Sequence, residues 1–543
     1  MQALVGFILA MSVTMVLMPL LMRWAAPLHI LDMPAGRKVH MTPVPRVGGI
    51  AMAGGIFTAL LLGARDFAPL AALLTGIAIL LCVGIWDDRR SLGAAPKFAG
   101  QAMAALVVIL WGGVSIVSLT FSDRIELPPW IALPLTFFFL LGGTNAFNLA
   151  DGLDGLAGGM AVLCFCGTAL LAYTVDNLAI AGIAVVFAGT VIGFLRYNTH
   201  PARVFMGDSG SLVLGFAAAV LALLLTQDPQ VPLSTALPLL LMGMPIIDTV
   251  TVMTERLLAK RSPFKADRRH LHHRLLAIGF EHRQAVIIFY GLQTALFVAA
   301  WFLRFATDTV VVLVFGVFVV LLVGTLHMAE KFHAMRAAVV PAGAARPQKD
   351  SARAESLQLR DAAAYLLGAT LLACAAWALL LGAVAGRDLM WLALALALLL
   401  AVSATLRWNR PDIGWSEKIA LYSGATLAIY LGKCSLPEQL HPMPIEYVVF
   451  ACMAFATVTI VRGSGDRLFK LTPLDMLVLV VVLIVPNLPD SFANSPALGS
   501  GLVELVLLCY AIEALSFSSL QTIRWLRGIA LVFLVAIAMR PLL

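Results

Sequence analysis

The sequence has little charge and no organised cysteine pattern. Only 12% of its 543 residues are Asp, Glu, Lys or Arg, whereas 61% are hydrophobic. A soluble domain is about one quarter charged, so this composition excludes an ordinary soluble protein. The seven cysteines include no Cys-x-x-Cys pair, and most stand in apolar runs. They are typical of small buried side chains and exclude a disulfide framework or a cysteine metal site.

Two common catalytic motifs are also absent. The chain contains no Gly-x-x-x-x-Gly-Lys-Ser/Thr, which excludes a P-loop, and no Gly-x-Ser-x-Gly, which excludes a nucleophile elbow. No basic residue precedes the first apolar run, which begins at Ala3. A secretory signal starts with a positively charged segment, so we expect this run to be retained as the first membrane span.

Long apolar runs dominate the chain. A bilayer span needs about 20 apolar residues, and the runs between polar breaks give roughly eighteen spans. The sequence therefore predicts an all-α, polytopic membrane helical bundle. We expect about 11 spans in a membrane-embedded domain at residues 1–330 and about 7 in a C-terminal extension at residues 361–543. A charged cytoplasmic linker, residues 331–360, separates them.

Positive charge is distributed unevenly among the loops of the first 360 residues. If the spans alternate and the N-terminus is outside, the inner loops hold 23 Lys and Arg, and the outer loops hold only Arg65, Arg124 and Arg304. By the positive-inside rule, the inner loops lie in the cytoplasm. Every polar motif described below falls on that face.

The stretch 145–159 places polar groups at the end of an apolar run. Gly152 and Gly155 interrupt the predicted helix there. Carboxylates at membrane depth are costly and usually functional. The alternative is a polar turn whose side chains bond to their own backbone. Four polar side chains recur at every third position: Asn145, Asn148, Asp151 and Asp154.

Two further loops carry acidic residues. Asp87 and Asp88 end an apolar run, where the helix dipole disfavours negative charge, so either Mg²⁺ or the following Arg89 and Arg90 must compensate. Asp208, in the stretch 205–211, begins another apolar run. It is either a helix N-cap or a metal ligand beside a phosphate-binding helix end.

The largest predicted inner loop is strongly basic. Eight Lys or Arg and four His fall between residues 256 and 283. Arg binds phosphate in a bidentate way, so the loop suits a pyrophosphate; anionic lipid headgroups or a solvated basic face are the alternatives. The His spacing lacks the partners of a zinc site. Asp248, in the preceding span, is either functional or structural, in which case it pairs with the helix face of Arg256 or with a neighbouring helix.

Carboxylates, Mg²⁺ and a loop rich in Arg and His are the groups that typically catalyse phosphoryl transfer. A site at the lipid boundary implies that one reactant is carried by a lipid. A secondary transporter would place its acids near the midplane, often in repeated halves, whereas these acids gather on one face of one half. A structural membrane protein would not need this acidic set.

Five stretches in order resemble the bacterial polyprenyl-phosphate N-acetylhexosamine-1-phosphate transferases, the group that includes MraY, WecA and TagO. The resemblance covers about residues 1–330. It is strongest to the WecA/TagO branch, because of Asp267-Arg-x-His-Leu-His-His273. The five stretches are Val39-His40…Pro43-Val-Pro-Arg46-x-Gly-Gly49, Asp87-Asp88, 145–159, 205–211 and 267–273.

The resemblance implies that undecaprenyl phosphate attacks the sugar-bearing phosphorus of a UDP-sugar and that UMP leaves. The product, a polyprenyl-pyrophosphate-sugar, starts a surface glycan. The WecA/TagO branch favours a UDP-N-acetylglucosamine donor over UDP-MurNAc-pentapeptide. The resemblance further implies Mg²⁺, with Mn²⁺ as an alternative, and a cytoplasmic active site in the bacterial inner membrane. It leaves a homodimer open.

The resemblance also assigns roles to individual residues. The metal ligands it implies are Asp208, Asp87 and Asn148. The catalytic residues it implies are Asp87, Asp88, Asp151, Asp154, His270, His272 and His273. As cofactor-binding residues we predict Asn148, Asp154, Lys97, Arg268 and Arg269.

The chemistry of the acceptor narrows the mechanism. The second pKa of a phosphate monoester is near 6, so the lipid phosphate is mostly dianionic at neutral pH and needs little help from a general base. Bringing two anions together is the larger problem. We therefore predict direct in-line attack, with cations lowering the repulsion. The competing hypothesis is a covalent intermediate on Asp88.

Overall fold

The computed structural model describes most of the first 339 residues and parts of the remainder. The chain divides into two compact units, Met1–Ala342 with Thr472–Leu477, and Gly343–Leu471 with Val478–Leu543. The described ranges are 2–33, 43–63, 69–121, 124–260, 270–339, 366–376, 387–410, 413, 415–433, single positions between 449 and 515, and 520–539.

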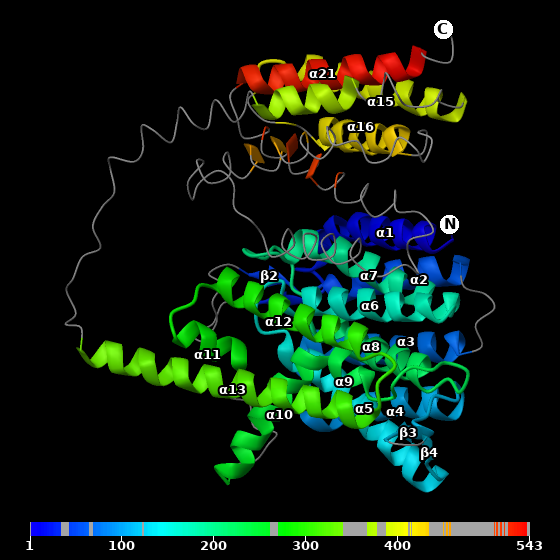
Figure 1. The fold of residues 1–543 in the computed structure, drawn as a ribbon, viewed down its shortest axis with the longest axis vertical. Helices are drawn as coiled ribbons and strands as arrows, with labels where there is room; N and C mark the ends of the chain where they lie inside the picture. The colour runs from blue at the N-terminus through cyan, green and yellow to red at the C-terminus, as the bar shows by residue number, and fades with distance from the viewer. Residues whose placement is uncertain are drawn as a thin grey trace. The chain divides into compact units, whose positions relative to one another are not determined.

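The first unit is built almost entirely from helices (Figure 1). Two short antiparallel hairpins interrupt them: β1 (Leu31–Asp32) pairs with β2 (Val44–Pro45), and β3 (Ser118–Thr120) pairs with β4 (Arg124–Glu126). The helices are α1 (Gln2–Trp24), α2 (Gly48–Gly63), α3 (Leu70–Arg90), α4 (Ala94–Leu110), α5 (Pro129–Ala150), α6 (Leu156–Thr174), α7 (Leu178–Asn198), α8 (Asp208–Thr226), α9 (Leu237–Leu241), α10 (Gly243–Leu258), α11 (Leu271–Ala277), α12 (His282–Phe302) and α13 (Asp308–Val339).

Nine helices within the described ranges are long and apolar enough to cross a membrane. This confirms the prediction of an all-α polytopic membrane protein. Eight of them belong to the first unit, where the apolar helices α2 and α4 are shorter, at 16 and 17 residues. Among residues 361–543 the structure describes helical ranges at 366–376, 387–406, 415–433 and 520–539, and the rest of the predicted C-terminal spans lie outside the described residues apart from single positions.

Helices α6 and α8 occupy the centre of the first unit. The apolar windows of α6 and α8 are 89% and 94% buried, whereas those of α1 and α13 are only 17% and 11% buried. A helix that is apolar all round is stable only when other helices or lipid surround it. Helix α8 packs on α3 and α5, and α6 packs on α7 and α12. Helices α1 and α13 lie at the periphery (Figure 1).

Chain direction decides where the polar loops gather. Helices α3, α5 and α7 end where α4, α6 and α8 begin, so the loops 91–93, 151–155 and 199–207 share one end of the bundle. The β3–β4 hairpin precedes α5 and therefore lies at the other end. Helix α5 has 22 residues, which at 1.5 Å per residue separates the two ends by about 33 Å.

In the second unit, helices α15 (Arg387–Leu406), α16 (Trp415–Lys433) and α21 (Leu520–Met539) pack together around small apolar cores. A buried ion pair joins two of them, because Arg527 donates to Glu417 over 3.1 Å. A buried charge pair is costly to break, since the remaining partner would stay unsolvated. This pair therefore helps to fix α16 against α21.

We predict that Gly159→Ala destabilises the first unit. A Cβ at this position on α6 would overlap the Tyr290 ring of α12, and overpacking of this kind lowers the free energy of unfolding by about 1–3 kcal/mol. Thermal unfolding in detergent measures the effect as a lower Tm. The matched control is Gly142→Ala on α5, where no heavy atom lies within 4 Å of the added Cβ. Equal melting of the two variants would contradict this account of the α6–α12 contact.

Candidate active site

A pocket of about 380 Å³ opens at the end of the bundle where the three polar loops meet. Acidic and amide side chains form part of its lining, and histidines and one arginine form another part. Its polar and charged lining residues are Asp32, Arg46, Asp88, Asn148, Asp151, Asp154, Asn198, His200, Asp208, His273 and His282. The structure therefore brings Asp88 from the end of α3, Asp154 from the α5–α6 turn and Asp208 from the start of α8 to one cavity.

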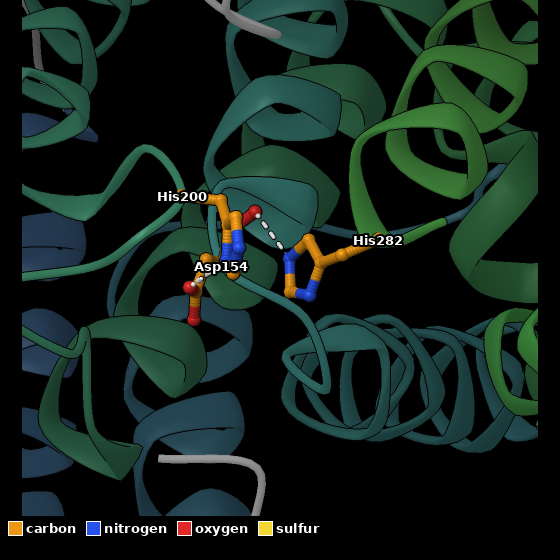
Figure 2. A group of neighbouring side chains, drawn as sticks. All are labelled: Asp154, His200 and His282. Atoms are coloured by element: carbon orange, nitrogen blue, oxygen red, sulfur yellow. Dashed lines mark hydrogen bonds and ion pairs between the residues drawn. The ribbon is translucent and has the colours of Figure 1, made fainter. Parts of the chain in front are cut away.

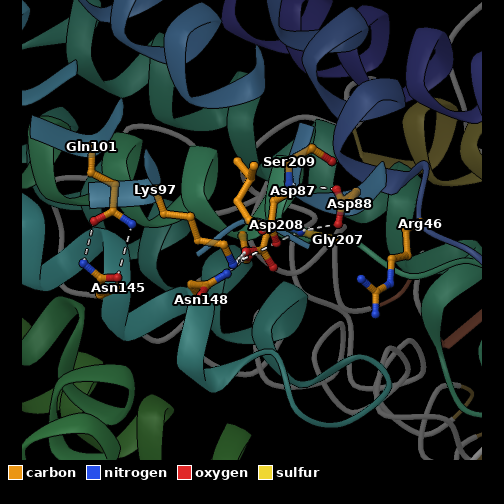
Figure 3. A network of polar contacts seen from close by, with 12 residues as sticks. Arg46, Asp87, Asp88, Lys97, Gln101, Asn145, Asn148, Gly207, Asp208 and Ser209 are labelled. Atoms are coloured by element: carbon orange, nitrogen blue, oxygen red, sulfur yellow. Dashed lines mark hydrogen bonds and ion pairs between the residues drawn. The ribbon is translucent and has the colours of Figure 1, made fainter. Parts of the chain in front are cut away.

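Lys97 joins two of the predicted acidic residues (Figure 3). Its Nζ atom lies 2.8 Å from Oδ2 of Asp87 and 2.5 Å from Oδ2 of Asp208. Asp87 also accepts a hydrogen bond from the backbone N–H of Leu92, at 2.6 Å. Because the lysine comes from the first turn of α4, its single positive charge is shared by two carboxylates carried by α3 and α8. Of the adjacent pair Asp87 and Asp88, Lys97 therefore compensates Asp87.

Asp88 has different partners from Asp87. Its two carboxylate oxygens accept hydrogen bonds from the backbone N–H groups of Asp208, at 3.0 Å, and Ser209, at 3.1 Å. These are the first two amides of α8. The N-cap position itself is Gly207, so neither Asp208 nor Ser209 serves as the cap. Arg89 and Arg90, the alternative partners predicted for these acids, are exposed, and Asp87 pairs with Lys97 instead.

The four polar residues of stretch 145–159 divide between α5 and the turn that follows it. Asn145 forms a reciprocal amide pair with Gln101 of α4, at 2.7 and 3.2 Å, which ties α5 to α4. Asn148 donates to the hydroxyl oxygen of Ser211, at 2.9 Å, which ties α5 to α8. Asp151 lies at the end of α5 and lines the pocket. Burial, followed by the nearby charges of Asp208 and Asp88, raises its pKa to about 7.

Asp154 lies in a cluster with two histidines that the sequence analysis did not assign (Figure 2). His200 Nδ1 is 2.7 Å from Asp154 Oδ2, which also accepts from the backbone N–H of Ala202 at 3.0 Å. His282 Nε2 lies 3.3 Å from the backbone oxygen of Asp154, and the two imidazole rings stack at 4.2 Å. Although burial opposes ionisation, the hydrogen bonds from His200 and Ala202 lower the pKa of the Asp154 carboxyl.

Asn198 was also missed, although it fixes the same turn. Its side chain accepts from the backbone N–H of Gly155, at 2.9 Å, and donates to the backbone oxygen of Val204, at 2.8 Å. The signal for Asn198 and His200 was present in the sequence, because both stand in the polar segment that leads to Asp208. His282 is counted among the four histidines of the basic segment 256–283, but it stands at the start of the apolar helix α12, outside the predicted His motif.

The three predicted histidines have different surroundings. His273 lines the pocket. His270 Nδ1 lies 3.0 Å from Oδ2 of Asp248, whose Oδ1 accepts from the backbone N–H of Leu271 at 2.7 Å. Asp248 thus fixes the start of α11, which agrees with the structural reading of that residue. Arg268 and Arg269 lie outside the described residues.

His272 is buried against the turn that carries the acids. A Cβ on Gly152 would overlap its ring, so the histidine packs directly on the backbone between Asp151 and Leu153. Burial is the main cause that lowers the pKa of His272 to about 3, and the ring is therefore neutral at pH 7. It acts on the pocket through packing, and it presents no positive charge to a phosphate.

The first predicted inner loop completes one wall of the site. The backbone N–H of Phe205 donates to the oxygen of Pro45, at 2.8 Å, and Gly48 N–H donates to the oxygen of Phe205, at 3.1 Å. Arg46 pairs with Asp32, and both side chains line the pocket. The segment 34–42, which includes the predicted basic residues before Arg46, lies outside the described residues.

The residues present suit a magnesium ion. Mg²⁺ prefers carboxylate and carbonyl oxygens, and the predicted ligands Asp208, Asp87 and Asn148 offer only such oxygens for the metal. The structure already places one cation, the Lys97 ammonium, against Asp87 and Asp208. Asp154, His200 and His282 are also close enough to share an ion, but their own hydrogen bonds account for that cluster.

Comparison with known proteins identifies relatives of this chain. Residues 70–226 match the family described as glycosyl transferase family 4. The chain is 36% identical over 306 residues to a probable undecaprenyl-phosphate N-acetylglucosaminyl 1-phosphate transferase of Bacillus subtilis. The aligned region covers 56% of this chain and 85% of the relative.

Two further relatives come from other bacteria. One is decaprenyl-phosphate N-acetylglucosaminephosphotransferase of Mycobacterium tuberculosis, 35% identical over 49% of this chain and 74% of the relative. The other is undecaprenyl-phosphate alpha-N-acetylglucosaminyl 1-phosphate transferase of Escherichia coli K12, 31% identical over the same shares. The helical bundle, the converging acidic loops and these similarities agree with the resemblance in the motifs, and the chain belongs to the polyprenyl-phosphate N-acetylhexosamine-1-phosphate transferases of glycosyl transferase family 4.

Proposed function

We propose that the chain transfers N-acetylglucosamine-1-phosphate from UDP-N-acetylglucosamine to undecaprenyl phosphate and releases UMP. The observation that carries the proposal is the convergence of Asp88, Asp151, Asp154 and Asp208 on one pocket at a helix end of a membrane bundle. The named activities of the relatives support the same donor and acceptor class. We assign the activity to residues 1–330, because every described residue of the site belongs to the first unit.

The pocket lining carries two chemically different kinds of group. The α5–α6 turn and the start of α8 contribute carboxylates, whereas His200, His273, His282 and Arg46 contribute donors. A nucleotide-sugar pyrophosphate needs donors for its oxygens. We therefore infer that the pyrophosphate of the donor lies toward the histidines and Arg46, and that the lipid phosphate approaches between this group and Asp208.

We propose Mg²⁺ as the metal, held by Asp208, Asp87 and Asn148. When bound, the ion would neutralise phosphate charge at the reacting centre. Lys97 has a separate task, because its ammonium group keeps Asp87 and Asp208 together without any metal. Oxygen ligands of this kind also accept Mn²⁺, so manganese is expected to support the reaction as well.

The decisive experiment is an assay of the purified chain in detergent with undecaprenyl phosphate and Mg²⁺. The donors are UDP-N-acetylglucosamine, other UDP-sugars and UDP-MurNAc-pentapeptide, and the readout is UMP release. We expect release with UDP-N-acetylglucosamine that depends on the lipid. Release only with UDP-MurNAc-pentapeptide would replace the proposed donor, and no release with any donor would reject the enzymatic function.

Asp208→Asn tests the proposed metal ligand. The variant keeps the size of the side chain but removes the charge that pairs with Lys97 and would bind Mg²⁺. We predict that kcat/KM for UMP release falls by about 10²–10³-fold, as for other groups that stabilise charge in a transition state. Asp228→Asn is the matched control, because Asp228 follows the opposite end of α8. Comparable losses in both variants would show that the effect does not arise at the pocket.

We further propose that the pocket faces the cytoplasm of a bacterial inner membrane and that the N-terminus is outside. The bias of Lys and Arg toward the loops at the pocket end supports this orientation. We predict that a membrane-impermeant thiol reagent labels Ile125→Cys in intact cells but labels Arg90→Cys only after permeabilisation. Both side chains are exposed, and they lie at opposite ends of the bundle. The unmodified chain controls for its native cysteines, and the reverse labelling pattern would invert the topology.

A further inference from the structure

We propose that Asp88 is a positioning residue that holds the start of α8, and with it Asp208, in the pocket, and that it is not a nucleophile. This inference rests on the proposed function and assigns one member of the acidic pair a role that the motif alone does not reveal. It also separates the two neighbouring aspartates, which the sequence presents as equivalent.

The hydrogen bonds of Asp88 use the amides that a helix normally leaves unpaired. The first four N–H groups of an α-helix have no partner within the helix. At α8, Asp88 accepts from Asp208 and Ser209, and the backbone oxygen of Gly207 accepts from Gly210 and Ser211, both at 3.1 Å. The protein itself therefore satisfies the amides of Asp208, Ser209 and Gly210, three of the four that the helix leaves unpaired. This helix end is already occupied, and a phosphate does not need to bind there.

Close packing holds the carboxylate in this position. On α3, one turn before Asp88, a Cβ at Gly84 would overlap the backbone of Ser209, so α3 approaches the start of α8 more closely than a larger residue would allow. Gly207 has φ +71°, a conformation that favours glycine, and a Cβ there would overlap the carboxylate of Asp88. The contact between Asp88 and the start of α8 therefore depends on the close approach of α3 to α8 and on the backbone of the turn between α7 and α8.

These surroundings oppose nucleophilic attack by Asp88. The residue is only 6% exposed, and both of its oxygens are engaged. The positive end of the α8 dipole stabilises a carboxylate, and esterification of Asp88 by a phosphoryl group would remove that negative charge and disturb both hydrogen bonds. Direct attack by the lipid phosphate requires no such rearrangement. Asp87, by contrast, faces Lys97 and the predicted metal ligand Asp208.

Hydrogen exchange on the metal-free, full-length chain tests the inference without relying on activity. The first amides of a helix ordinarily exchange freely, so protection at Asp208 and Ser209 reports the contact with Asp88. We expect Asp88→Asn to speed exchange of these amides by about tenfold, the effect of losing a charge-assisted hydrogen bond. Overlapping peptides across residues 205–214 measure it. The adjacent Asp87→Asn is the matched control and should leave these amides protected.

A second variant keeps the carboxylate and moves it. Gly207→Ala should expose the same two amides, because the added Cβ displaces Asp88. Size-exclusion chromatography and the exchange of the central part of α8 establish whether each variant is folded. Unchanged protection at Asp208 and Ser209 in both folded variants would overturn the positioning role.

The dependence of activity on Mg²⁺ concentration distinguishes a positioning role from a purely structural defect. If Asp88 positions Asp208, Asp88→Asn should raise the Mg²⁺ concentration for half-maximal activity by about tenfold, and high Mg²⁺ should restore much of kcat. If Asp88 is a nucleophile, no Mg²⁺ concentration restores turnover. The wild type would then release one equivalent of UMP without lipid, and Asp88→Asn would abolish this burst. Failure of wild-type turnover would count against the proposed function alone, because the exchange result stands independently.

Discussion

The site depends on the compensation of negative charge at the end of a membrane helix bundle. Asp87 and Asp208 share the ammonium group of Lys97, and Asp88 is compensated by two backbone amides of α8. A carboxylate that leaves water without such partners is strongly destabilising. With these partners, three acidic side chains can remain close together on helices that otherwise contact apolar surroundings, and they provide the oxygen-rich, negatively charged surface that a divalent cation requires.

Helix topology and close packing make this compensation possible. Because α3, α5 and α7 all end where their successors begin, the acids of three loops reach one end of the bundle. Small residues then allow the helices to approach one another, as membrane helices commonly do. Gly84 brings α3 against the start of α8, and Gly152 brings the α5–α6 turn against His272. The pocket is thus formed by backbone proximity as much as by the side chains that line it.

Much of the molecule could be predicted from residue types and their spacing. Apolar runs indicated a polytopic helical bundle, because each span must satisfy its own backbone in lipid. The spacing of Asn145, Asn148, Asp151 and Asp154 indicated a site, because such groups are costly near a membrane. Spacing could not separate Asp87 from Asp88, since adjacent residues on a helix face different neighbours, and those neighbours come from α4 and α8.

The sequence by itself determined the fold class, the end of the chain that carries the chemistry, and the identity of most acidic residues, because hydropathy and charge act locally along the chain. The tertiary structure alone decided the partners: Lys97 between two aspartates, Asp88 on the α8 amides, His200 and His282 on Asp154, and His272 beneath the turn. These contacts join residues up to 128 positions apart. Their formation depends on how helices pack, which no local pattern encodes.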